Sequence, residues 1–224
     1  GRVYWSTATV VYQRRVVDYY FDYCCPWTYL SFKRLIQTTT RTASVINWKP
    51  ILLADIEQEL GSIIDPKIPH PSEIKYETKD LQDWANYCGL KITLRNDDPK
   101  NVSKKALCGA FCAIEANKIA DYSRLVFGAY FGGLKDISNN EVLTEIATKL
   151  ELDPTDYESG INSMVNLKRL KNNATDLIER GGFGSPTMFV EDDMYFGNDR
   201  IPLVEFSIGR ASGKILVLPG QHGT

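Results

Sequence analysis

The chain has 224 residues, 24% of them charged, and a formal net charge of −2 at pH 7. This balance is typical of a globular protein and disfavours a surface that binds nucleic acid or anionic membranes. No apolar run approaches the ~18 residues that a membrane-spanning helix needs. Two histidines and five cysteines without a C-x-x-C pair favour neither a bound metal nor a secreted disulfide framework. We therefore expect a reducing compartment, the cytoplasm.

The first fifteen residues, GRVYWSTATVVYQRR, contain three arginines and no acidic residue. Such a segment is compatible with part of a mitochondrial targeting sequence, and equally with an extension that packs on the domain. Residues 1–15 are therefore interpreted as an N-terminal extension, with a mitochondrial location as the alternative to the cytoplasm.

The next segment predicts a strand, a helix and a second strand. VVDYYFDY (16–23) is β-branched and aromatic, which indicates a buried strand. Pro26 suits the first turn of a helix through WTYLSFKRLIQ, because the N–H that proline lacks has no partner there. SVINWKPILL (44–53) predicts the second strand and its exit. This succession favours a parallel pair within an α/β unit.

The middle of the chain has helical patterns. SEIKYETKDLQDWANYC predicts a helix that ends at Gly89, a common helix stop. Further helical patterns cover residues 102–133, 140–152 and 153–182. Cys108 and Cys112 lie four residues apart on one face of such a helix and are predicted to be small buried side chains.

The C-terminal part returns to strands. SPTMFVEDDMYFGNDR predicts a hairpin around an acidic turn at Glu191–Asp193, and IPLVEFSIGRASG predicts a final amphipathic helix. The order βαβ, helical block, ββα indicates an α/β domain split by a helical insertion. Residues 16–53 and 176–224 form the predicted discontinuous domain, and residues 54–175 form the insertion.

Cys25 is the first candidate catalytic residue. It precedes a helix that begins with Pro26, so unpaired N–H groups and the helix dipole are expected to stabilise its thiolate and lower its pKa. Thr28 stands where a disulfide catalyst carries its second cysteine, and Cys24 is too close to resolve a mixed disulfide without strain. The alternative interpretation is an inert buried cysteine.

The Gly-rich loop before the hairpin carries the second set of candidates. Pro186 opens a strand, and base rates alone favour a trans peptide bond before it. Asn198 and Asp199 precede the last helix and suit its N-cap. Together with Arg200, which can bind a carboxylate with two hydrogen bonds, they form a candidate anion site.

FDYCCPWTYL and FGSPTMFVEDDMYFGNDR, with YETKDLQDWANYCG between them, resemble motifs of the 2-hydroxychromene-2-carboxylate isomerases and the kappa-class glutathione transferases. The corresponding sequence motifs of the family are, in the same order, FDFxSPYSYLA, FGVPTMFxxxxMxWGNDR and YxxxDLxRWAxxYG. The resemblance covers most of residues 16 to 211. It implies a thioredoxin-like domain with an inserted all-helical domain, as in the DsbA group, and a homodimer.

The resemblance also implies site residues. The family's active-site serine, which orients the sulfur of glutathione, falls on Cys25. Ser185 and Pro186 fall on a cis-proline pair that binds the glutathione backbone. The loop for the γ-glutamyl end falls on Phe196, Gly197, Asn198, Asp199 and Arg200. The substrate pocket falls near Glu57, Gln58, Lys67, Ile68 and Asp98, where Lys67 is the sole cation and two acids disfavour an anionic aromatic substrate.

Three functions are weighed on this basis. The first is a glutathione-dependent isomerase or transferase for a small, electrophilic, aromatic substrate. The second is a monothiol oxidoreductase, because CPWT resembles the CPWC of DsbA-like enzymes without its last cysteine. The third is a non-catalytic protein that binds glutathione or a similar ligand.

Overall fold

A computed structural model describes residues 15–61, 68–95, 98 and 101–211. Within these residues, four strands form one sheet in the order β2-β1-β3-β4. The strands are β1 (Val16–Phe21), β2 (Val45–Pro50), β3 (Thr187–Val190) and β4 (Asp193–Phe196). β1 and β2 are parallel, and β3 and β4 form an antiparallel hairpin, so both predictions are confirmed.

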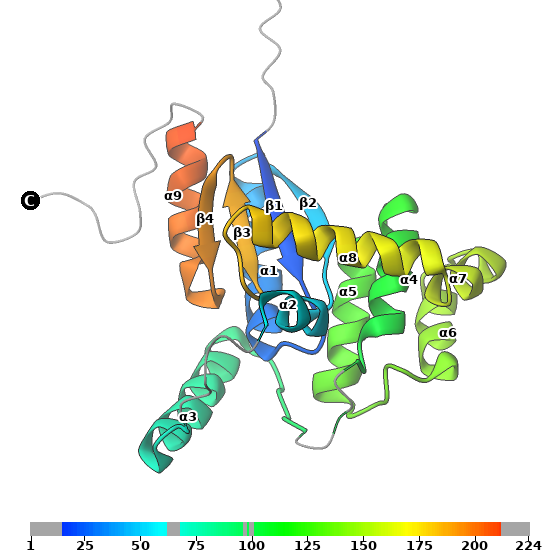
Figure 1. Cartoon of the computed structure of the whole chain (residues 1–224), viewed down its shortest axis with the longest axis horizontal. Coiled ribbons are helices and arrows are strands. Elements are labelled where there is room, and N and C mark those ends of the chain that lie inside the picture. Colours follow the sequence, from blue (N-terminus) through cyan, green and yellow to red (C-terminus); the bar gives the residue numbers. More distant parts are fainter. Residues whose placement is uncertain (1–14, 62–67, 96–97, 99–100, 212–224) are drawn as a thin grey trace, which may run out of the picture.

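Helices account for most of the remaining described chain (Figure 1). They are α1 (Pro26–Arg41), α2 (Leu53–Leu60), α3 (Pro71–Cys88), α4 (Lys104–Glu115), α5 (Ile119–Phe127), the π-helical turn η1 (Gly128–Gly132), α6 (Asn140–Lys149), α7 (Pro154–Ile161), α8 (Met164–Glu179), the 3-10 turn η2 (Asn198–Arg200) and α9 (Ile201–Ala211). Local signals start several of them: Pro26 is the first residue of α1, and His70 and Glu73 form a capping box on α3.

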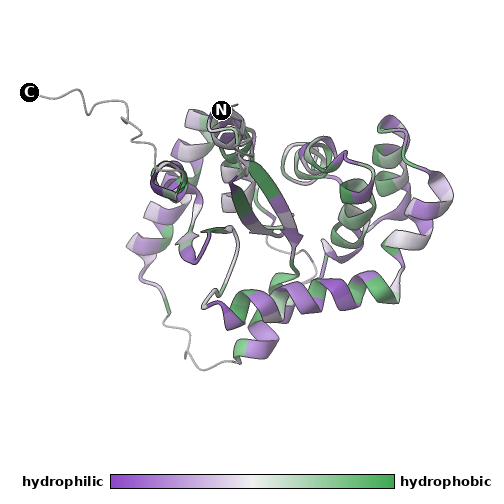
Figure 2. Ribbon diagram, turned by 90° about the horizontal axis from the view of Figure 1, so that it is seen from above, coloured by the Kyte–Doolittle hydropathy of each residue, from purple (hydrophilic) through white to green (hydrophobic). Residues whose placement is uncertain are grey.

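The two faces of the sheet are covered by different helices. Alternating side chains of β1 explain this, because Tyr19 and Phe21 join the core that includes α1 and α9, whereas Tyr20 packs with residues of α2 and α8. Figure 2 shows hydrophobic residues concentrated in the central strands, while the surrounding helices carry both hydrophobic and hydrophilic residues. The sheet therefore lies in the middle of a three-layer arrangement.

The insertion is helical, as predicted, and is divided more finely than its periodicity indicated. Residues 102–133 form α4, α5 and η1 because Asn117 has a left-handed φ of 57°, which ends α4. Ser163 caps α8 and separates it from α7. Figure 1 shows α4 to α7 gathered on one side of the sheet, with α3 projecting away from the rest. The predicted boundary at residue 175 lies inside α8.

The structure tests some of the remaining sequence predictions, and others concern residues that it does not describe. Gly89 ends α3 with a φ of 67°, as predicted. Cys108 is buried, whereas Cys112 is half-buried because its turn of α4 is only partly covered, so the prediction of a buried side chain is wrong for Cys112. Residues 1–14 of the predicted N-terminal extension and Lys67 lie outside the described residues. In the described part of the chain, no helix is long and apolar enough to cross a membrane.

Candidate active site

Three segments meet at one edge of the sheet. Because β1 and β2 are parallel, the chain leaves Phe21 and Pro50 at the same edge. β3 is antiparallel, with Thr187 opposite Tyr20, so the pair Ser185–Pro186 enters the sheet at that edge as well. The topology thereby brings together two candidate segments that are 160 residues apart in sequence.

Cys25 occupies the N-cap position of α1, as predicted. Its backbone is extended, its side chain is 9% exposed, and Pro26 is the first helical residue. The Cys25 Sγ donates a hydrogen bond to the Ser185 carbonyl oxygen at 3.3 Å. The thiol therefore sits between the N-terminus of α1 and the loop before β3.

The predicted lowering of the Cys25 pKa is wrong for the ligand-free chain. Burial raises the pKa of this thiol, hydrogen bonds from Thr28 lower it less, and the charge of Asp22 adds to the rise. Removal from water penalises the thiolate by more than the helix N-terminus stabilises it. Cys25 is consequently a neutral thiol at pH 7, a hydrogen-bond donor and a weak nucleophile.

This neutrality has a measurable consequence. Without glutathione, we expect the rate of Cys25 alkylation by iodoacetamide to rise with a midpoint above that of free cysteine, about pH 8.5. Alkylation is followed by mass spectrometry on the peptide that carries Cys25, in a Cys24→Ala background, because Cys24, Cys88 and Cys112 are partly exposed thiols that react as well. Free N-acetylcysteine under the same conditions is the reference, and a midpoint below the reference would contradict the buried-thiol description.

The Ser185–Pro186 bond is cis. The resemblance implied this geometry and is confirmed at this position, whereas the base-rate expectation of a trans bond is wrong. The Ser185 hydroxyl accepts from the Asp22 N–H at 3.1 Å and lies 2.6 Å from the Thr28 hydroxyl. Thr28, which stands where a second redox cysteine would lie, thus joins α1 to the cis-proline loop.

Asp22 is a central residue that the sequence analysis missed. Its fully buried carboxylate accepts from the Cys24 N–H at 3.1 Å, the Leu53 N–H at 2.9 Å and the Ser103 hydroxyl at 2.6 Å. Burial raises the pKa of this carboxyl, and the three hydrogen bonds lower it by less. Asp22 therefore fixes the thiol segment against the first residues of α2 and α4. An acid inside an otherwise apolar strand pattern was the signal that could have identified it.

The candidate γ-glutamyl loop lies beside the cis-proline loop. The Gly197 N–H donates to the Pro186 carbonyl at 3.0 Å, and Gly197 has a φ of 109°, a conformation that favours glycine. Phe196 packs on Phe183 with ring centroids 4.7 Å apart. The loop continues directly into η2 and α9, so its backbone is held from both sides.

The polar side chains of this loop differ in how accessible they are to a ligand. Asn198 is buried, and its carbonyl and side-chain oxygens both accept from the Arg34 guanidinium, so the side chain is not free to cap the helix. Arg34, which the sequence analysis also missed, lies 5.0 Å from the Trp84 ring. Asp199 and Arg200 form an ion pair at 3.5 Å, and each side chain is about half exposed, 49% and 51%. A carboxylate and a guanidinium are therefore accessible side by side.

The structure describes four of the five residues expected to line a substrate pocket. Glu57 and Gln58 are exposed on α2, and Ile68 is 90% exposed. Gln58 lines a groove between α2 and α8 that does not include Cys25. Asp98 accepts a hydrogen bond from the Tyr130 hydroxyl and lies 3.6 Å from the Arg95 guanidinium. The negative charge of Asp98 is thereby already paired.

Arg95 supplies a cation that the sequence analysis did not consider. Its guanidinium lies 5.4 Å from the centroid of the Tyr130 ring, and its Nη2 is buried without a hydrogen-bond partner among the described residues. Tyr130 packs edge-on against Phe131, with ring centroids 4.8 Å apart. Phe131 stacks on Tyr29 in the first turn of α1, which follows Cys25. A buried, unpaired guanidinium nitrogen near the thiols suits an anionic ligand group.

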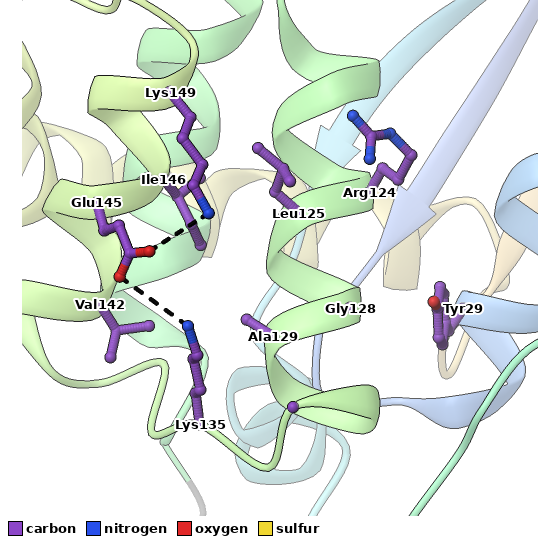
Figure 3. Close-up of a pocket in the computed structure, with 11 residues that line it drawn as sticks. Tyr29, Arg124, Leu125, Gly128, Ala129, Lys135, Val142, Glu145, Ile146 and Lys149 are labelled. Carbon is purple, nitrogen blue, oxygen red and sulfur yellow. Dashed lines mark ion pairs between the residues drawn. The ribbon is translucent and has the colours of Figure 1, made fainter.

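A second cavity lies beside α1. Its volume is about 410 Å³, and it is lined by residues of α5, η1 and α6 and by Tyr29 of α1 (Figure 3). Tyr29 stacks on the rings of Phe127 and Phe131. Glu145 pairs with Lys135 at 3.9 Å and with Lys149 at 3.3 Å, so its single negative charge offsets one of the two lysine charges. None of the predicted site residues lines this cavity.

No group of three or more His, Cys, Asp or Glu side chains in the described ranges could hold a metal ion. The chemistry of this edge of the sheet rests instead on a thiol, hydroxyls, a buried carboxylate and arginines. That set can bind and orient a thiol ligand and an anionic group.

Comparison with known proteins agrees with this geometry. Residues 16–209 match the family model described as a DSBA-like thioredoxin domain. A 2-hydroxychromene-2-carboxylate isomerase from Pseudomonas putida is 29% identical over 198 residues, 87% of this chain and 95% of the relative. Glutathione S-transferase kappa 2 from Caenorhabditis elegans is 24% identical over 206 residues, 85% of this chain and 90% of the relative.

A solved structure described as 2-hydroxychromene-2-carboxylate isomerase superposes with a TM-score of 0.76 at 28% identity, over 88% of this chain and 95% of the other. The predicted fold class, a thioredoxin-like α/β domain with a helical insertion, is confirmed by the family match and by this superposition. The chain belongs to the family of DsbA-like thioredoxin domains.

Proposed function

We propose that this chain is a glutathione-dependent isomerase or transferase, similar to 2-hydroxychromene-2-carboxylate isomerase, for a small electrophilic aromatic substrate. The observation that carries the proposal is a neutral, buried Cys25 thiol at the N-terminus of α1, 3.3 Å from the carbonyl before the cis-proline. A neutral thiol donates a hydrogen bond to an anionic sulfur, and a helix N-terminus favours the same negative charge.

The residues present fit glutathione. The γ-glutamyl end carries an ammonium and a carboxylate, which complement the half-exposed pair of Asp199 and Arg200. The Ser185 carbonyl accepts only a weak thiol donor and keeps a lone pair for a peptide N–H. When bound, glutathione supplies a thiolate nucleophile for addition to an electrophilic carbon.

The side chains around the proposed glutathione site have different roles. Cys25 turns its single S–H from the Ser185 carbonyl to the glutathione sulfur and holds that sulfur as a thiolate. Asp22 and Thr28 position the Cys25 segment against α2, α4 and the cis-proline loop. Arg34 fixes Asn198 and with it the γ-glutamyl loop. Arg95 offers its unpaired nitrogen to an anionic group of the substrate.

The two rival functions make different demands. A monothiol oxidoreductase needs Cys25 as a thiolate, and burial opposes that ionisation. A non-catalytic binding protein would hold glutathione without turnover. The homodimer and the cytoplasmic or mitochondrial location stay predictions.

Activity with and without reduced glutathione tests the proposal. Hydroxychromene carboxylates, quinone-like compounds and haloarenes are the candidate electrophiles, and a glutathionylated peptide is the competing substrate. We expect turnover of at least one electrophile to require glutathione. Strong reduction of the peptide without any isomerisation or conjugation would overturn the proposal, and tight glutathione binding without any turnover would favour a binding protein.

A further inference from the structure

A groove lies on the sheet face opposite to α1. α2 packs on α8, and the first turn of α4 closes one end of the space between them. Figure 1 shows α2 lying next to α8 there. The groove has a volume of about 420 Å³, enough for a small molecule, and neither Cys25 nor the γ-glutamyl loop lines it.

The groove gathers three lysines from two helices. Lys104 comes from α4, and Lys168 and Lys171 come from α8. Within the described residues none of the three forms an ion pair, whereas Lys49, Lys79, Lys135 and Lys149 elsewhere do. Three like charges around one groove repel one another, and an anion between them reduces that repulsion.

Asp55 is the single acid among the residues that line the groove. Its side chain is only partly exposed, burial raises the pKa of its carboxyl, and Lys171 and Lys104 lower it. Among the lining residues alone, three lysines and one ionised carboxylate leave an excess of two positive charges, and the carboxylates of Asp22 and Glu59 outside the lining also act on Asp55. The whole chain has a formal charge of −2, so the excess is local to the groove.

The backbone of α4 adds to this positive potential. Ser103 is the N-cap residue of α4, but its hydroxyl donates to Asp22 and does not cap the helix. The first turn contains no acidic residue, and Asn101 lines the groove just before it. The helix has 12 residues, so its N-terminal dipole reinforces the three lysines.

We propose that this groove binds a small dianion of the phosphate-ester type, with an apolar or neutral body. Two negative charges match the excess of two positive charges. Lysine ammonium groups and a helix N-terminus are established phosphate-binding groups in proteins. Leu52, Ala54 and Leu167 supply the apolar wall against which the rest of the ligand lies. This site is independent of the proposed glutathione site.

The test uses the full chain and pyrophosphate as the probe, in low-salt buffer, by calorimetry and by amide chemical shifts. We expect binding, with the shifts confined to α2, the first turn of α4 and the first half of α8. The double substitution Lys168→Gln with Lys171→Gln removes two charges from exposed positions and is expected to weaken binding at least tenfold. Succinate is the matched dicarboxylate probe and is expected to bind more weakly.

The control variant is Lys33→Gln with Lys75→Gln, which removes the same charge from exposed positions on α1 and α3. It is expected to bind pyrophosphate as the wild type does. Absence of binding at millimolar probe, or an equal loss in the control variant, overturns the site. Tighter binding of succinate than of pyrophosphate overturns the phosphate assignment. Unfolding temperatures of both variants confirm that they are folded.

Discussion

Cys25→Ser is expected to keep glutathione-dependent turnover within roughly tenfold of the wild type, whereas Cys25→Ala loses roughly 10²–10³-fold, the usual cost of removing one donor to an anionic centre. The physical reason is that the buried Cys25 thiol is neutral and acts as a hydrogen-bond donor. A serine hydroxyl at the same N-cap is a stronger donor than a thiol, and serine is a favourable capping residue. Alanine fills the position without any donor.

This pair of variants separates the two enzymatic functions. If Cys25 attacked disulfides as a nucleophile, serine and alanine would be equally inactive, because a hydroxyl cannot form a mixed disulfide. The measurement is kcat/KM for glutathione addition and, in parallel, for reduction of a glutathionylated peptide. Equal losses in both variants, together with strong peptide reduction by the wild type, would contradict the donor role. Glutathione binding by calorimetry shows whether the loss in the alanine variant lies in binding or in turnover.

Asp22→Ala is expected to lower the free energy of unfolding by roughly 3 kcal/mol or more, since each buried donor left without a partner costs about 1–3 kcal/mol. The substitution removes the acceptor of three hydrogen bonds, from Cys24, Leu53 and Ser103. These bonds join the end of β1 to the first residues of α2 and α4. The loss is therefore larger than that of a typical surface substitution.

Asp18→Ala is the matched control for this prediction. Asp18 lies on the same strand and pairs with Arg180 at 2.9 Å, but its side chain is 24% exposed. Partly exposed ion pairs of this kind contribute about 0–1 kcal/mol, so we expect a small change. Urea denaturation of both variants measures the difference. A loss for Asp22→Ala no larger than for Asp18→Ala would contradict the central role of Asp22.

The pH dependence of stability gives a second measurement on Asp22. Burial holds its pKa in the folded chain above the value in the unfolded chain, so folding favours the protonated carboxyl. The stability that this preference contributes is fully present below the unfolded pKa and is lost as pH rises through the folded pKa. Asp22→Asn removes the titrating group, and its unfolding free energy is expected to lack this decline.

Much of the fold follows from short-range patterns in the sequence. Pro26 at the start of α1, the acidic turn between β3 and β4, and Gly89 after α3 are local signals, and the structure confirms each. These patterns act within a few residues, because helix caps and tight turns depend on φ angles and on nearby hydrogen bonds. The order of strands and helices then restricts the topology to a parallel β1–β2 pair with a helical insertion.

The chemistry of the site was decided by contacts between distant parts of the chain. The sequence identified Cys25 as a helix N-cap and from that predicted a lowered pKa. Burial under the cis-proline loop, 160 residues away, raises the pKa instead. The dipole of α1 is a local property, but the loss of solvent depends on which segments cover the thiol.

The same reason explains the residues that the sequence analysis missed or misjudged. Asp22 bonds to Ser103, 81 residues away, and Arg34 bonds to Asn198, 164 residues away. The sequence predicted that the charge of Asp98 disfavours an anionic substrate, whereas in the structure this carboxylate pairs with Arg95 and accepts a hydrogen bond from Tyr130. Sequence alone therefore determined the order and the approximate positions of the strands and helices and which loops carry polar groups. The tertiary structure decided which of those groups are buried, paired or free, because charge pairing and desolvation depend on distances that the sequence does not contain.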